Sequence, residues 1–248
     1  MRRLFALALL AAPATAFADC DALPDHGALK QALTEARQAK NGGLNLDMWG
    51  AVVDRSGTVC AVAYTGDGVD AQWPASRAIA AQKANTANGL SLKGGALSTA
   101  NLYAGTQPGG FLYGLQESNP VDTSAAYAGD AARYGSERDP MVGKRIGGVN
   151  VFGGGLALYD ANGEILGALG VSGDTSCADH NIAWRARHAL KLDFVPAGPP
   201  KQKDDNIIYD FAGGKSPSGF GHPTCLGPEK DIAKDLPKTE VVNAKKPE

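Results

Sequence analysis

The chain has 248 residues, a formal net charge of −2 and 44% hydrophobic residues. This length and composition allow a sizeable buried core, and the absence of a basic face argues against binding to nucleic acid or to an anionic membrane. We therefore expect a soluble domain with extensions.

Residues 1–18 have the three parts of a secretory signal peptide: two arginines, a short apolar run and a small-x-small exit. We expect cleavage before Asp19 and a periplasmic or secreted mature protein. Its cysteines should then oxidise to two disulfides. No C-x-x-C motif occurs, which argues against a thioredoxin-like or zinc-knuckle motif.

The first elements follow in chain order. Residues 27–40 carry apolar side chains at helical spacing and end in Asn41-Gly42-Gly43, which predicts a short helix. Residues 49–64 contain two β-branched runs around an Asp-Arg-Ser-Gly turn, which predicts a hairpin. Residues 74–89 predict an alanine-rich helix whose small side chains favour close approach to a sheet.

Residues 89–155 form a glycine-rich insert in which we expect long loops and one short helix over 97–103. Residues 155–173 predict a second hairpin around Asp160, whose likeness to the first hairpin we attribute to turn chemistry rather than duplication. A last helix follows from Ser176, where Ser176-Cys177-Ala178-Asp179 is a capping-box pattern in which Asp179 helps to cap the helix. Its predicted buried stripe, which excludes His180 and His188, consists of Ile182, Ala183, Ala186, Ala189 and Leu190.

After Phe194 the chain is rich in proline and polar residues, so 195–248 should be an extended tail whose last 20 or so residues are mobile. Because hairpins alternate with helices, the sheet should be mostly antiparallel. The predicted fold class is α+β, an antiparallel sheet flanked by helices.

Three stretches carry a resemblance to a known family. They are AVVDRSGTVCAVAYTGDG (51–68), SRAIAAQKANTA (76–87) and IGGVNVFGGGLALYDANGEILGALGVSGDTSCADHNIA (146–183). In their order and spacing these motifs resemble the GlcG/HbpS-like haem-binding proteins. The resemblance implies a profilin-like domain over 19–194, a haem or related tetrapyrrole ligand and a homo-oligomer. The long insert, Tyr64-Thr65-Gly66 and the tail depart from the family pattern.

Haem needs an axial donor, an apolar slot and partners for its propionates. The four cysteines allow three pairings, and we favour Cys177 with Cys225 and Cys20 with Cys60. The first pair would pin the tail to the last helix and bring His180 near His222, a candidate bis-histidine site for haem or a transition metal. The alternative is that both histidines only join the tail to the domain by hydrogen bonds.

Other candidate residues have ordinary structural explanations as well. Arg185 and Arg187 could pair with propionates or be solvated, and Tyr103 could supply a phenolate or pack in a satellite cluster. We interpret His26 as a helix cap. His180 and His188 stand about 12 Å apart along a helix, too far to hold one small ion together.

No nucleophile elbow, phosphate loop or H-E-x-x-H motif occurs, and no catalytic set is assembled. We therefore expect an exported haem-binding protein that acts as a carrier, sensor or scavenger. Two alternatives remain open. One is an enzyme or accessory subunit of a periplasmic dehydrogenase, with a deep pocket lined by the insert. The other is a binding module for another small molecule, whose pocket would lack a donor side chain.

Overall fold

The computed structural model describes residues 20–242, so the signal peptide expected at 1–18 lies outside the described residues. Within 20–242 no helix combines the length and apolar character that crossing a bilayer requires. The helices are α1 (His26–Gln38), α2 (Ser76–Leu90), α3 (Thr99–Thr106), α4 (Thr123–Ala126), α5 (Ser176–Ala189) and α6 (Pro228–Lys234), and short 3₁₀ turns span Cys20–Ala22 and Ala131–Arg133. The strands are β1 (Trp49–Asp54), β2 (Val59–Tyr64), β3 (Gly155–Tyr159) and β4 (Ile165–Ser172).

The four strands form one antiparallel sheet in the order β2-β1-β4-β3, which confirms the predicted α+β architecture. Each hairpin turns on an aspartate. Asp54 Oδ1 accepts the backbone N–H groups of Ser56 and Thr58, and Asp160 Oδ1 accepts those of Asn162 and Glu164. The same local chemistry thus closes both turns, as the sequence analysis proposed.

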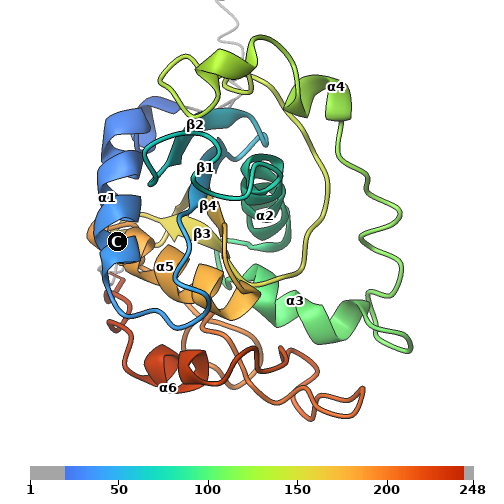
Figure 1. The fold of residues 1–248 in the computed structure, drawn as a ribbon. Coiled ribbons are helices and arrows are strands. Elements are labelled where there is room, and N and C mark those ends of the chain that lie inside the picture. Colours follow the sequence, from blue (N-terminus) through green and yellow to red (C-terminus); the bar gives the residue numbers. More distant parts are fainter. Residues whose placement is uncertain (1–19, 243–248) are drawn as a thin grey trace, which may run out of the picture.

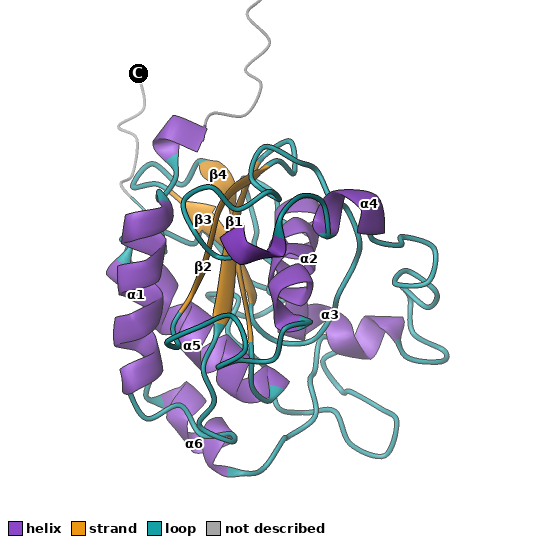
Figure 2. Ribbon diagram, turned by 45° about the horizontal axis from the view of Figure 1, so that its top comes forward, coloured by secondary structure: helices purple, strands orange, loops and turns teal. Residues whose placement is uncertain are grey.

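Helices cover both faces of the sheet (Figures 1 and 2). α1 and α5 pack on one face over a core that includes Leu33, Val52 and Leu169, and α2 packs on the other. α2 comes so close that a Cβ on Gly170 would lie 1.9 Å from the carbonyl oxygen of Ala80. The absence of a side chain at this strand position therefore permits the predicted close approach.

The glycine-rich insert is fastened to the domain by a buried ion pair. Arg77 on α2 donates two hydrogen bonds to the carboxylate of Asp139 and one to Ala126 O at 2.7 Å. The guanidinium also lies over the Tyr134 ring, 3.7 Å from its centroid. These contacts tie the insert to the sheet side of α2.

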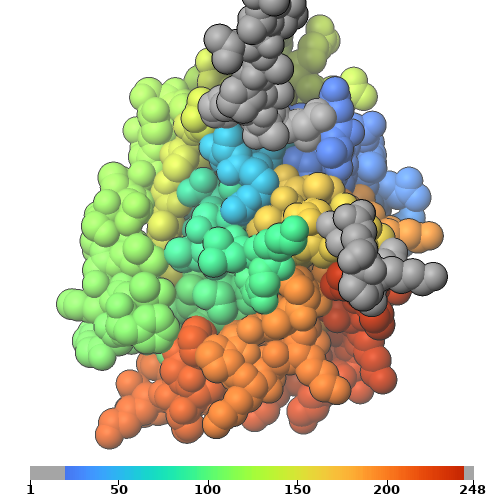
Figure 3. All heavy atoms as spheres, turned by 180° about the vertical axis from the view of Figure 1, so that it is seen from behind, coloured from blue at the N-terminus to red at the C-terminus, as the bar shows by residue number. Residues whose placement is uncertain are grey.

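The tail forms a layer across one end of the molecule, where it is seen in orange and red beside the insert (Figure 3). Its distal part, where the sequence predicted mobility, contains α6, which packs on α5 and buries Glu229 and Ala233. Trp184 Nε1 of α5 donates to Pro237 O at 2.8 Å. The tail is in close contact with the domain as far as this residue.

The prediction that one side of α5 is exposed was wrong, because the tail covers that side. His180, Trp184 and Arg187 are all buried, while Ala189, which was expected in the buried stripe, is exposed. The error has a clear cause: a helical wheel separates polar from apolar faces, but here a second layer of chain covers the polar face. The helix cap differs as well: Thr175, not Ser176, accepts the N–H of Ala178, and Asp179 accepts the backbone N–H of Asp174 rather than that of the capping residue.

Candidate functional site

Two disulfides join the pairs favoured from the sequence, Cys20–Cys60 and Cys177–Cys225. The second connects the first turn of α5 to the tail. It places His180 and His222 in one buried layer between α5 and the tail, where each side chain is at most 1% exposed.

The two histidines have different partners. His180 Nε2 lies 3.1 Å from both Ile207 N and Asn206 Oδ1, so the tail already occupies this nitrogen. His222 Nδ1 lies 2.7 Å from Pro223 O and therefore carries the proton that this carbonyl accepts. The lone pair of His222 is then on Nε2, a buried atom without a hydrogen-bond partner among residues 20–242.

Burial keeps both imidazoles neutral. Desolvation lowers the pKa of His180 to about 3 and that of His222 to about 4. Asp205 and the Asn206 hydrogen bond raise the pKa of His180, and the Pro223 hydrogen bond raises that of His222, but neither effect overcomes burial. A neutral ring with a free Nε2 and an Nδ1–H held by a backbone carbonyl is the usual form of a metal-binding histidine.

The Tyr103 ring packs against His222 and is itself in contact with two phenylalanine rings. The Tyr103 ring is 5.0 Å from that of His222, 5.2 Å from that of Phe211 and 6.0 Å from that of Phe152, measured between centroids. Phe211 in turn lines a cavity of about 570 Å³ between the insert and the tail. Tyr103 thus separates the His222 ring from this cavity by one layer of aromatic side chains.

The 570 Å³ cavity is formed by two glycine-rich loops. Its walls include Phe111 and Phe211, and Lys215 supplies a cation. The enzyme hypothesis required a pocket lined by the insert alone, whereas both the insert and the tail line this one.

Arg185 and His26 lie elsewhere. Arg185 is held by Asn41 Oδ1 at 3.1 Å and Lys40 O at 3.4 Å, beside α1. Asp25, not His26, caps α1, and His26 Nε2 lies 2.8 Å from Gly135 O of the insert. His26 lines a separate cavity of about 440 Å³ next to β2.

A further cluster was missed by the sequence analysis. Lys83 of α2 and Asp179 of α5 form an ion pair of 2.7 Å, with each side chain at most 3% exposed. Burial raises the pKa of Asp179 to about 6, although Lys83 acts in the opposite direction. The signal was present in the sequence, because a lysine among the small apolar residues of a sheet-facing helix must be buried with a partner.

The Lys83–Asp179 pair lies at a cavity of about 360 Å³. Trp73 and Phe152, 50% and 45% exposed, line it together with the buried pair. The other lining residues are mostly polar and come from α2, from the loop before β3, from the end of β4 with the connection that follows it, and from the start of α5: Ser76, Ile79, Asn150, Ser172, Asp174 and Ser176.

The pKa values predict how stability depends on pH. Both histidines have folded pKa values below the ordinary 6.5, so the unfolded chain binds more protons and stability falls as the pH drops below about 6.5. Asp179 has the opposite effect on stability between its ordinary pKa of 3.8 and pH 6, because the folded state holds its proton more tightly.

Replacing His222 by asparagine should make stability less sensitive to pH. Between pH 6 and 4, we expect the slope of the free energy of unfolding against pH, measured by urea denaturation, to be smaller by about 1 kcal/mol per pH unit for His222→Asn than for the wild type. His188→Asn is the control. A slope in His222→Asn equal to that of the wild type would contradict the assignment of this pH dependence to His222.

No curated protein sequence matches the chain. Among solved structures, a PduOC haem complex is 27% identical, with a TM-score of 0.45 and coverage of 66% of this chain and 89% of that one. The protein ORFY from Klebsiella pneumoniae is 26% identical, with a TM-score of 0.44 and coverage of 67% and 90%. A double mutant of HbpS from Streptomyces reticuli is 18% identical, with a TM-score of 0.44 and coverage of 77% and 98%.

The family model of the HbpS-like haem degrading proteins matches residues 26–188 of this sequence. Of the described strands and α-helices, this range includes all except α6 and the final residue of α5. The match begins at α1 and contains the three stretches on which the sequence resemblance rested, and the tail follows it. The chain therefore belongs to the HbpS-like haem degrading protein family.

Proposed function

We propose that the protein binds haem in an oxidising compartment outside the cytoplasm, with His222 Nε2 as the donor to iron. The observation that carries this proposal is the orphaned Nε2 of a neutral, fully buried imidazole whose other nitrogen is fixed by Pro223 O. Haem requires such a donor together with apolar contacts and partners for its propionates. Membership of a family named for haem chemistry supports the same ligand class.

The residues around His222 fit the requirements of the group. Tyr103 provides an aromatic ring next to the donor, and Phe211, which contacts Tyr103, lines the adjoining cavity together with Lys215, a cation for a propionate. Bound haem would supply a redox-active iron. The protein's part is to offer a neutral nitrogen, to exclude water with the aromatic rings and to hold the imidazole in one tautomer.

His180 takes the role of a supporting residue in this proposal. Its Nε2 is occupied by the Asn206 and Ile207 contacts, so it anchors the tail segment that leads to His222. Arg185 is engaged by α1 and is not assigned to the propionates. A carrier, sensor or scavenger role, a periplasmic or secreted location and a homo-oligomer complete the proposal.

Haem titration of the mature protein and its histidine variants tests the donor. Removing only the outer partner of a metal-binding histidine weakens metal binding by roughly 10–100-fold, so His222→Ala should weaken haem binding by at least about tenfold. His188→Ala, whose ring is paired with Asp193, is the matched control and should leave the Soret shift unchanged. If His26→Ala loses the Soret shift and His222→Ala retains it, the iron donor would be assigned to the cavity beside β2, and the assignment to His222 would be overturned.

A further inference from the structure

The cavity at Lys83 has the features of a second binding site, separate from His222. It contains two hydroxyl groups with no hydrogen-bond partner among residues 20–242, those of Ser76 and Ser172. These side chains belong to residues only 2% and 4% exposed, and both line the cavity. Their hydroxyl oxygens are not among the fully buried unpartnered atoms of residues 20–242, so they are open to the cavity and available to a ligand there.

Lys83 adds a third donor. Its ammonium group has three N–H bonds, of which one goes to Asp179 Oδ2 at 2.7 Å and one to Val171 O at 3.1 Å. The third remains for a ligand. Ser176, the first residue of the 14-residue helix α5, also lines the cavity.

The carboxylates at the cavity are already satisfied. Asp174 accepts the backbone N–H groups of Leu44, Leu46 and Thr175, and Asp179 accepts Lys83 and Asp174 N. The groups left over are the third N–H of Lys83, which can only donate, and two hydroxyls, which can donate or accept, so a ligand that presents an acceptor can engage each of them. The charges of Lys83 and Asp179 cancel, while Asp174 leaves a negative charge that disfavours an anion.

The loop before β3 packs closely against the atoms that hold Lys83. Gly154 has φ = +120°, and a Cβ there would lie 2.3 Å from Val171 O and 3.2 Å from Lys83 Nζ. A side chain at this position would press on the atoms that hold the lysine. Phe152, two residues earlier, contributes one aromatic wall, and Trp73 contributes another.

We infer that this cavity binds a small, planar, uncharged molecule whose carbonyl oxygen accepts from Lys83, Ser76 and Ser172 while its ring contacts Trp73 and Phe152. The cavity volume of about 360 Å³ lies at the lower end of ligand sites, which suits a two-ring compound rather than a macrocycle. None of the lining residues is a histidine, tyrosine, methionine or cysteine, so the site offers no haem donor.

Binding of 2-quinolone, followed by calorimetry on the full mature protein, tests the inference. We expect naphthalene, which lacks the carbonyl, and 1-naphthoate, which carries a charge, to bind at least about tenfold more weakly. Comparable affinity for either compound, or no heat with 2-quinolone at millimolar concentration, would overturn it.

Variants locate the binding. Ser172→Ala removes one donor and Trp73→Ala removes one wall, and each should weaken 2-quinolone binding by about tenfold. Both changes spare the buried ion pair, and Trp73 is half-exposed, so the fold should persist. Tyr113→Ala, an exposed aromatic outside the cavity, is the control. Equal affinities in Tyr113→Ala, Trp73→Ala and Ser172→Ala would place the compound elsewhere. His222→Ala should leave 2-quinolone binding intact even where it abolishes haem binding, which keeps the two proposals distinguishable.

Discussion

Replacing Asp205 by alanine should lower the free energy of unfolding by about 3–5 kcal/mol, because it leaves the Arg187 guanidinium buried without its partner. Arg187 Nη1 and Nη2 lie 2.9 and 2.7 Å from the two carboxylate oxygens of Asp205. Neither side chain is exposed. The pair joins α5 to the tail, so its loss should also loosen the tail.

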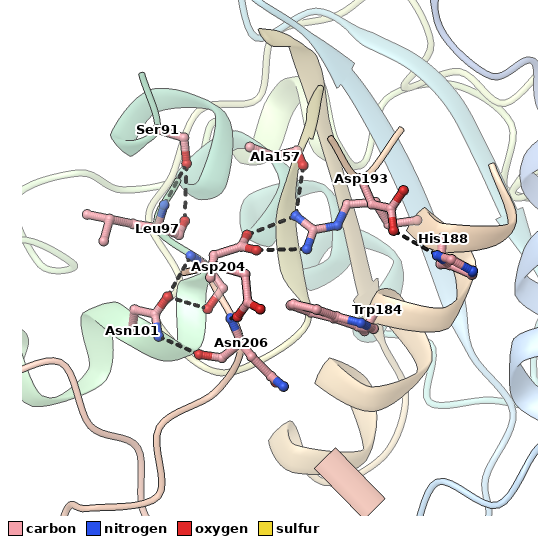
Figure 4. A network of polar contacts seen from close by, with 12 residues as sticks. Ser91, Leu97, Asn101, Ala157, Trp184, His188, Asp193, Asp204 and Asn206 are labelled. Atoms are coloured by element: carbon pink, nitrogen blue, oxygen red, sulfur yellow. Dashed lines mark hydrogen bonds and ion pairs between the residues drawn. The ribbon is translucent and has the colours of Figure 1, made fainter. Parts of the chain in front are cut away.

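The surroundings of this pair explain the size of the effect. Arg187 donates to Ala157 O of β3 at 3.0 Å and lies over the Trp184 ring, so the guanidinium cannot turn toward solvent. Figure 4 shows Ala157, Trp184, Asp204 and Asn206 around this network.

Urea denaturation of Asp205→Ala, compared with that of Asp204→Ala, measures the loss of stability. Among residues 20–242 the Asp204 carboxylate accepts only the N–H of Asn206, at 3.1 Å, so its replacement should cost about 1 kcal/mol. Similar losses in both variants would contradict the argument.

Removing the tail disulfide in Cys177→Ala with Cys225→Ala should lower the free energy of unfolding by about 2–4 kcal/mol. The bond closes a loop with a sequence separation of 48, so its loss frees the unfolded chain substantially. The tail should also become sensitive to proteolysis between Asn206 and Cys225. Limited proteolysis with mass spectrometry of the fragments checks this.

The chain provides a matched control for this change. Cys20–Cys60 closes a loop with a similar sequence separation of 40, at the opposite end of the sequence. Cys20→Ala with Cys60→Ala should destabilise the protein to a similar extent but leave the tail protected. Equal protection of the tail in both double variants would show that the tail is held without the Cys177–Cys225 bond.

Local features of the fold were predictable from the sequence. Both hairpins and α1, α2 and α5 follow from periodicity and from turn residues such as Asp54 and Asp160, whose side chains organise only their immediate neighbours. The closeness of His180 to the tail was also predictable, since one disulfide sets it.

Long-range polar pairs were not predictable in the same way. Lys83 meets Asp179, 96 residues away, only because α2 and α5 approach from opposite faces at the end of the sheet. Asp139 meets Arg77 because the insert folds back over α2. The sequence around Lys83 indicates a buried lysine but not its partner, and no local pattern identifies Asp179 or Asp139 as the partner of a distant cation. The coverage of α5 by the tail likewise depends on tertiary packing.

The central claim is that the tail, fixed to α5 by Cys177–Cys225, supplies the iron donor. Haem titration of the two cysteine double variants, with Soret absorbance as the readout, tests it most directly. Cys177→Ala with Cys225→Ala should bind haem at least about tenfold more weakly than the wild type, because His222 lies three residues before Cys225 and loses its fixed position. Cys20→Ala with Cys60→Ala should retain wild-type affinity. Wild-type haem affinity in the variant with a released tail would contradict the claim.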